Sequence, residues 1–318
     1  MEEKHRGMGD KKYGGTICFI ILALIVIGLI IMGVNSKKPG RLELGKLDAG
    51  VKGAAFIKTN ETLIQQMCDN WLPNDVFWPT ALLDNMPNFQ IGELEVVRYN
   101  IRVLRDNLSR MRTTDKLDPW AEGAFTALSN DPLKWWLPSA ESRWVKASKD
   151  LGAFYKGLQN GSSHFYPRAD NLVELFSQYA SLMGGVNTRL INAPQRKDMV
   201  LPVNEDVKKD LGGDELVQIN IPWHKIDDNF YYAQGVAYAL HESFKAIRID
   251  FIDVLKRKNS LKLVDKIIED LGRCHFEPWI VFNGAPESIF ANHSLNLSSV
   301  FNDARQKVYS LIVALQQG

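Results

Sequence analysis

The sequence predicts a mainly α-helical protein, with one N-terminal transmembrane helix followed by an elongated antiparallel helical bundle. Three observations lead to this fold class. Residues 16–34 contain neither a charge nor a proline. Elsewhere, apolar residues recur at spacings of three and four, the repeat of a helix with one buried face. Proline and tryptophan gather between those segments, where helices are expected to end.

The apolar segment 16–34 has the sequence TICFIILALIVIGLIIMGV. At about 1.5 Å per residue it extends about 28 Å, close to the hydrocarbon thickness of a bilayer. A buried core helix of this length would normally keep a polar face. A cleaved signal peptide fits Lys11 and Lys12, but the following NSKK is a poor cleavage site. We therefore expect an uncleaved anchor.

The orientation of this span is not decided by its flanking charges. Four basic residues lie on each side: Lys4, Arg6, Lys11 and Lys12 before it, and Lys37, Lys38, Arg41 and Lys46 after it. Long domains that follow a span are translocated largely regardless of charge, so the second group has little influence. We expect a cytoplasmic N-terminus and an exported body.

The chain divides into four expected parts. These are a short tail (1–15), the transmembrane helix (16–34), a juxtamembrane linker (35–50) and a helical-bundle domain (51–318). The last two parts together carry 34 basic and 34 acidic residues. Such a neutral body argues against nucleic-acid binding, which needs an excess of Lys and Arg. Lys37, Lys38 and Arg41 are better placed to meet lipid headgroups.

Five segments of the body show an apolar seam. The clearest lies in 223–259, predicts a helix of about 35 residues, and keeps a heptad spacing for four repeats. Its members are Ile226, Phe230, Ala233, Ala237, Leu240, Phe244, Ile247, Phe251 and Val254. The other four seams lie within 94–111, 144–158, 172–186 and 297–315. Because several of the connections are short, an antiparallel bundle is the economical packing.

The breaks between these helices have their own pattern. Six of the eight Trp lie within two residues of a Pro: Trp71, Trp78, Trp120, Trp136, Trp223 and Trp279. We interpret 71–90 (WLPNDVFWPTALLDNMPNFQ) as a helix-to-helix reversal, with Asn74 or Asp75 as an N-cap. Around 199–221, alternating apolar residues predict a possible short β-hairpin.

Reactive constellations are missing from the sequence. His241-Glu242 begins like a zinc-protease motif, but Lys245 stands where the second His is required. We therefore expect no catalytic residue, no metal and no cofactor. In an exported body Cys68 and Cys274 could form a disulfide, although two buried thiols are the simpler interpretation.

A polar and aromatic patch suited to a peptide or glycan is the candidate binding site. Its candidate residues are Asn74, Asp75, Trp78, Asp84, Asn85 and Trp136, with Asn292 and His293 as a further group. The alternative is that these residues serve only as helix caps and hinge packing.

Several stretches give the chain a specific resemblance. NDVFWPTALLDNMPNFQIGEL, WWLPSAES, FYPRADNL, DDNFYYAQGVAYALHESFKAIRIDF and FANHSLNLSSV together span most of the body. With them the chain resembles a bacterial family of membrane-anchored proteins, domain of unknown function 2333. The resemblance implies a bacterial cell-envelope protein with one N-terminal membrane helix and a helical domain. Together with the orientation expected above, we predict a single-pass protein of the inner membrane with its body in the periplasm. The resemblance carries no activity or catalytic residue with it.

The leading functional hypothesis is a membrane-tethered, non-enzymatic scaffold or protein-interaction module of the cell envelope. It implies the lipid bilayer and an envelope protein as partners, and leaves the oligomeric state open. The alternative is an exported sensor that holds a small ligand at the Trp- and Pro-rich end. A less favoured third is a hydrolase of envelope polymers that uses Asp75 or Asp84 as acid or base.

Overall fold

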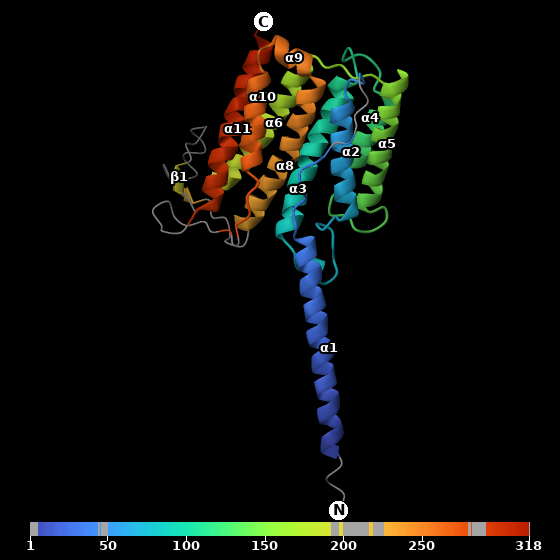
Figure 1. Ribbon diagram of the computed structural model, residues 1–318, viewed down its shortest axis with the longest axis vertical. Coiled ribbons are helices and arrows are strands. Elements are labelled where there is room, and N and C mark those ends of the chain that lie inside the picture. The colour runs from blue at the N-terminus through green and yellow to red at the C-terminus, as the bar shows by residue number, and fades with distance from the viewer. Residues whose placement is uncertain are drawn as a thin grey trace, which may run out of the picture.

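The computed structural model describes residues 6–43, 45, 50–191, 197–199, 216–218, 226–278, 281 and 291–317. A long helix, α1 (Arg6–Asn35), projects from one end of a helical bundle (Figure 1). We call this end of the bundle the α1 end and the opposite one the far end. The helix begins ten residues before the apolar segment, and its part Gly15–Asn35 is long and apolar enough to span a membrane.

The bundle is built from helices and short helical turns. Its first half contains α2 (Ala54–Asp69), η1 (Thr80–Leu82), α3 (Asn85–Val103), the π-helical turn η2 (Leu104–Leu108), α4 (Pro119–Leu128) and α5 (Ala140–Asn160). Its second half contains α6 (Ala169–Ile191), α8 (Ile226–Asp250), α9 (Ile252–Arg257), α10 (Leu261–Arg273) and α11 (His293–Gln316). Within the described residues, this confirms the predicted mainly helical bundle.

Most packed pairs of helices are antiparallel, but the central pair is not. Both α3 and α8 begin at the α1 end (Figure 1), and they make the most extensive contact in the bundle. Gly92 and Gly235 permit it, because a Cβ at either position would overlap the backbone of the facing helix at Tyr232 or Phe89. The heptad seam alone does not distinguish this parallel pairing from an antiparallel one.

The predicted seam of 223–259 is buried as expected: Phe230, Ala233, Ala237, Leu240, Phe244, Ile247, Phe251 and Val254 are all in the core. The predicted single helix of about 35 residues is wrong, however, since α8 ends at Asp250 and α9 begins at Ile252. The Asp250 carboxylate accepts hydrogen bonds from the N–H groups of Gly53, Ala55 and Phe56. It thus serves the start of α2, whose N-cap is a glycine.

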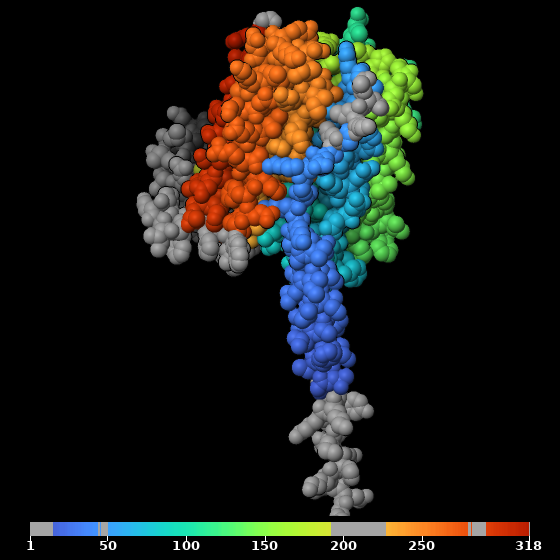
Figure 2. Space-filling model, viewed as in Figure 1, coloured from blue at the N-terminus to red at the C-terminus, as the bar shows by residue number. Residues whose placement is uncertain are grey.

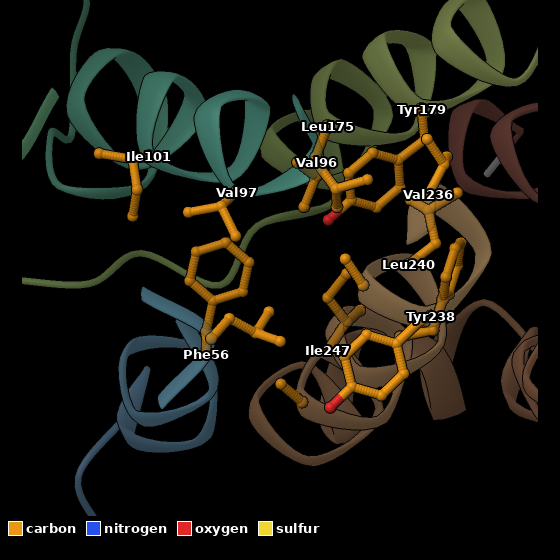
Figure 3. Close-up of a cluster of buried hydrophobic side chains, with 14 of the residues drawn as sticks. Phe56, Val96, Val97, Ile101, Leu175, Tyr179, Val236, Tyr238, Leu240 and Ile247 are labelled. Carbon is orange, nitrogen blue, oxygen red and sulfur yellow. The ribbon is translucent and has the colours of Figure 1, made fainter. Parts of the chain in front are cut away.

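Side chains from four helices meet in the middle of the bundle (Figure 3). Phe56 of α2, Val97 of α3, Tyr179 of α6 and Leu240 of α8 are fully buried there. In the region of the predicted hairpin, β1 (Lys197–Met199) and β2 (Leu216–Gln218) pair antiparallel. The rest of 199–221 lies outside the described residues.

The segment after α1 does not extend freely from the helix. Residues 36–43, which we call the strap, lie on the surface of the bundle between α2 and α10 (Figure 2). Leu42 is buried, and Tyr238 of α8 donates a hydrogen bond to the Gly40 carbonyl at 2.9 Å. The strap therefore joins α1 to the bundle by packed contacts as well as by the chain itself.

Candidate functional site

Two loops at the α1 end are tied to each other by hydrogen bonds. They are the α2–α3 loop (70–84) and the α4–α5 loop (129–139). Trp71 Nε1 donates to the Pro132 carbonyl at 2.9 Å, and Asn74 Nδ2 donates to the Lys134 carbonyl at 3.3 Å and to Glu141 Oε1 at 3.0 Å. Trp71 also packs edge-on against Trp144, with ring centroids 4.4 Å apart. The two loops consequently form one continuous surface.

Of the predicted polar residues, Asn74 and Asp84 have structural roles. The prediction of Asn74 or Asp75 as an N-cap is wrong, because no helix begins directly after them and the Asn74 side chain instead joins the two loops. Asp84 is the N-cap of α3 and accepts from the Asn85 N–H at 2.8 Å. Asp75 is exposed. The hinge and cap interpretation therefore accounts for Asn74 and Asp84, whereas Asn85 takes part only through its backbone N–H.

The predicted aromatic residues Trp78 and Trp136 are exposed instead. Trp78 is 54% exposed and Trp136 is 65% exposed, with the Trp136 ring 5.2 Å from that of Trp135. Outside α1, eight of the fifteen exposed large apolar side chains among the described residues lie in the two loops. They are Val76, Phe77, Trp78, Leu82, Leu133, Trp135, Trp136 and Leu137. We call these eight residues the apolar tips.

One of the tips reaches α1 itself. The Trp78 ring packs on α1 at Gly28, where an added Cβ would overlap the ring. Gly28 is buried, whereas nearly all the apolar side chains around it on α1 are exposed. The α2–α3 loop therefore lies alongside the apolar segment of α1 and not only at its end.

The second predicted group, Asn292 and His293, lies elsewhere at the α1 end. Asn292 is the N-cap of α11 and accepts from the Leu295 N–H at 2.9 Å. The His293 ring faces Phe276, with centroids 6.5 Å apart. Because α11 and the α4–α5 pair are on opposite sides of the bundle (Figure 1), the structure does not bring this group to the apolar tips. Trp223 and Trp279 lie outside the described residues.

The strap makes a ladder of polar contacts with α8 that sequence reasoning missed. Lys38 Nζ donates to Gln234 Oε1 at 2.6 Å, and Lys245 Nζ donates to the Leu42 carbonyl at 3.1 Å. Between them, Arg41 lies 4.0 Å from the buried carboxylate of Glu242. Burial lowers the pKa of Lys38 to about 8, against the opposing effect of Glu277. In the sequence, the signal for this contact was the polar residues Gln234, Glu242 and Lys245, which interrupt the apolar pattern of α8.

Two further buried polar features lie inside the bundle. Glu93 of α3 is 2% exposed, its Oε1 has no hydrogen-bond partner among the described residues, and burial raises its pKa to about 8. Asn100 donates to Asn60 and Ser243, each at 2.9 Å, and accepts from the Tyr179 hydroxyl. This second network joins α2, α3, α6 and α8, and its members satisfy one another, as buried polar groups must.

The two cysteines of the body are free thiols in the structure. The disulfide considered from the sequence is therefore not formed. Of the two buried thiols expected instead, Cys274 is buried and Cys68 is half-buried. Cys68 faces the Glu141 carbonyl at 3.9 Å, whereas Cys274 faces the Asp270 carbonyl at 3.5 Å, on a different helix. Burial raises the pKa of both thiols to about 12, so neither is a reactive thiolate at neutral pH.

A hollow of about 470 Å³ lies at the far end, away from the apolar tips. Lys52, Pro167, Asp250 and Arg257 are among the residues that line it. Within the described part of the chain, no three His, Cys, Asp or Glu side chains are grouped closely enough to hold a metal ion. At the α1 end the two loops instead display apolar and aromatic side chains.

Comparison with known proteins places this architecture in a family. The family model described as an uncharacterized protein conserved in bacteria, DUF2333, matches residues 14–318. The chain belongs to this family. The match confirms the resemblance seen in the sequence and covers both the apolar part of α1 and the bundle. No curated protein and no solved structure matches the chain.

Proposed function

We propose that this member of DUF2333 is a membrane-tethered, non-enzymatic scaffold or protein-interaction module of the bacterial cell envelope. In this proposal α1 crosses the inner membrane once, with the N-terminus in the cytoplasm and the bundle in the periplasm. The bundle then presents its sides and its far end to an envelope protein partner.

The observation that carries the proposal is the exposed apolar surface of α1. Of the large apolar side chains between Ile17 and Val34, thirteen are exposed. So large an apolar surface is unstable in water and is matched by a bilayer. The packing of Trp78 on Gly28 and the docked strap favour an anchor that stays with the bundle over a cleaved signal peptide. The extent of the family match, which includes the helix, points the same way.

The non-enzymatic part of the proposal rests on the interior of the bundle. The heptad-seam positions of α8 are apolar, its buried Gln234 and Glu242 are held by Lys38 and Lys245, and the Asn100 network is closed by its own hydrogen bonds. Cofactor and catalytic sites in helical bundles usually place acidic or His residues at such positions. Asp84, one of the two carboxylates considered for a hydrolase, is used as a helix cap.

Membrane insertion and orientation are tested with fusions to the full chain. Alkaline phosphatase placed after Gly318 follows α11, which ends at the far end, so the fusion does not disturb the α1 end. We expect active phosphatase, a dark green fluorescent protein at the same position, and an N-terminal tag that stays in the membrane fraction. Fluorescence from the C-terminal fusion would show that the orientation is the opposite of the one proposed. Loss of the N-terminal tag from the membrane-bound protein would rule out the anchor.

The scaffold role is tested by photo-crosslinking in the native cells. A crosslinkable residue at exposed Arg112 or Lys116, between η2 and α4 at the far end, should capture an envelope protein. Leu137 at the α1 end is the matched control position, because it is also exposed but faces the expected membrane. If the far-end positions yield only the protein itself, the scaffold role is wrong.

A further inference from the structure

We propose that the apolar tips of the α2–α3 and α4–α5 loops insert into the lipid bilayer beside α1, in the leaflet from which the bundle emerges. This inference rests on the proposed function, since it requires α1 to cross the membrane. It assigns the bundle a second, non-spanning membrane contact and therefore a preferred orientation relative to the bilayer.

The first argument is depth along α1. Val34 ends the apolar segment, and Gly28, which contacts Trp78, lies six residues earlier. At about 1.5 Å per residue, the Trp78 ring lies about 9 Å along the helix from the end of its apolar part. Side chains of interfacial membrane elements reach about 5–10 Å into the boundary between headgroups and acyl chains. The position of Trp78 falls in this range.

The second argument is the composition of the tips. No charged residue occurs in 76–83, and Asp75 and Asp84 lie immediately outside this stretch. The other tip, 135–138 (WWLP), is also uncharged and follows Lys134. Trp and Leu side chains bounded by polar and charged groups are typical of protein surfaces at the membrane interface.

The third argument is that the tips are held on a fixed platform. The hydrogen bonds from Trp71 to Pro132 and from Asn74 to Lys134 hold the two loops against each other. The Trp71 and Trp144 rings pack directly behind them in the core. The exposure of Phe77 and Leu137, at 74% and 80%, is therefore a property of a folded surface.

Lipid is the occupant that this geometry favours over a protein partner. The tip at Trp78 is continuous with the exposed apolar side chains of α1, such as Ile25 and Leu29, which require lipid around them. A protein covering the tip would have to occupy the same annulus as that lipid. The loop and the upper part of α1 lie side by side in Figure 1.

The test places spin labels on the full chain in phosphatidylcholine and phosphatidylglycerol vesicles. Cys18, Cys68 and Cys274 are first replaced by Ala, and single cysteines are introduced at Phe77, Leu137, Met111 and Ile25. Met111 is the matched control, since it is 56% exposed but lies at the far end. Collisions with oxygen and with a water-soluble nickel chelate report whether each label is in lipid or in water.

We expect oxygen to exceed nickel in accessibility at Phe77, Leu137 and Ile25, and the reverse at Met111. Labels at Phe77 and Leu137 that behave like the one at Met111, while Ile25 remains in lipid, would overturn the insertion and leave the anchor intact. A label in water at Ile25 would overturn the anchor itself. The two proposals therefore fail in distinguishable ways.

A second measurement keeps the native cysteines, so that it does not depend on the folding of the Ala background. Tryptophan fluorescence of the full chain is quenched with brominated lipids. Replacing Trp135 and Trp136 by Phe should lower the quenched fraction, and replacing Trp120 by Phe should raise it, because Trp120 lies at the far end. An unchanged quenched fraction in the Trp135 and Trp136 variant would overturn the insertion of the α4–α5 tip.

Discussion

Both ends of the bundle contain loops that reverse the chain between helices, but these loops carry different side chains. At the α1 end, the loops that reverse the helices expose uncharged, aromatic tips. At the far end, the reversal between η2 and α4 is held by Arg110, which donates to the carbonyls of Asp106, Thr113 and Asp115. Arg168 adds a bond to the Met111 carbonyl at 3.1 Å.

The difference supports the proposal that the two ends face different surroundings. Both ends close helices of the same core, yet the far-end reversal 109–120 exposes three large apolar side chains, Met111, Leu117 and Trp120, whereas the two loops at the α1 end expose eight. Exposed arginine is well hydrated, whereas a cluster of exposed Trp, Phe and Leu is stabilised by an apolar surrounding. Under that proposal the comparison orients the bundle independently of the basic residues that flank α1.

The largest expected effect on stability is at Trp71, which is buried behind the apolar tips, in comparison with Trp120, which is exposed at the far end. Trp71→Ala should lower the free energy of unfolding by about 3–5 kcal/mol, because Trp71 is 4% exposed and packs on Trp144. Trp120→Ala is the control, with an expected loss below about 1 kcal/mol at a 44% exposed site. Urea unfolding of the full chain in nanodiscs measures both; equal losses would contradict the comparison.

Glu93, buried in the bundle, should make the free energy of unfolding depend on pH. The pKa of Glu93 rises from 4.5 in the unfolded chain to about 8 in the folded protein, so the folded state binds more protons between these values. Stability contributed by this group should then fall as pH rises, by about 2 kcal/mol between pH 6 and pH 8. Glu93→Gln removes this contribution.

The measurement for Glu93 is the difference in unfolding free energy between the native protein and Glu93→Gln at each pH. Comparing the two proteins cancels the titration of groups that both share. Glu95→Gln, on the same helix but only partly buried, is the matched control. A difference that does not change with pH would show that Glu93 is ionised in the folded state throughout.

A smaller effect tests the link between the two loops. Asn74→Ala removes hydrogen bonds to the Lys134 carbonyl and to Glu141, which should cost about 1–2 kcal/mol. Hydrogen exchange of the α4–α5 loop should also accelerate, although the substitution is in the other loop. Asp75→Ala is the neighbouring exposed control. If exchange in the α4–α5 loop is the same in both variants, the loops are not coupled through Asn74.

The smallest effect on stability is expected at the tips themselves. Phe77→Ser combined with Leu137→Ser should change the unfolding free energy by less than about 0.5 kcal/mol, because both side chains are mostly exposed. The measurement is made in amphipol, without detergent. Met111→Ser at the far end is the control. A loss of several kcal/mol would mean that the tips belong to the core.

Much of the fold follows from local pattern. The uncharged segment 16–34 fits one long helix whatever surrounds it, and the seam from Phe230 to Val254 had to be buried because apolar side chains recur on one face. The loop 71–90 was recognised as a reversal from its prolines, and Asn292 as part of a polar group. The cap at Asp84 is of the same local kind.

Other features depend on contacts between distant parts of the chain. The parallel pairing of α3 with α8, the cap that Asp250 supplies to α2 and the strap on α8 each join residues that are far apart in sequence. The same holds for the tips. The sequence indicated Trp78 and Trp136 as candidate contact residues, but their exposure at one end is a property of the packed bundle.

By itself the sequence determined which faces of α3, α5, α6, α8 and α11 are apolar and which segment is long enough for a bilayer, because these depend on residues within a few turns of one another. The tertiary structure alone decided which helices are neighbours, which polar groups become buried, and that the aromatic loops lie beside α1. These outcomes require side chains to fit across the bundle, and a periodic pattern contains no information about which partner fits.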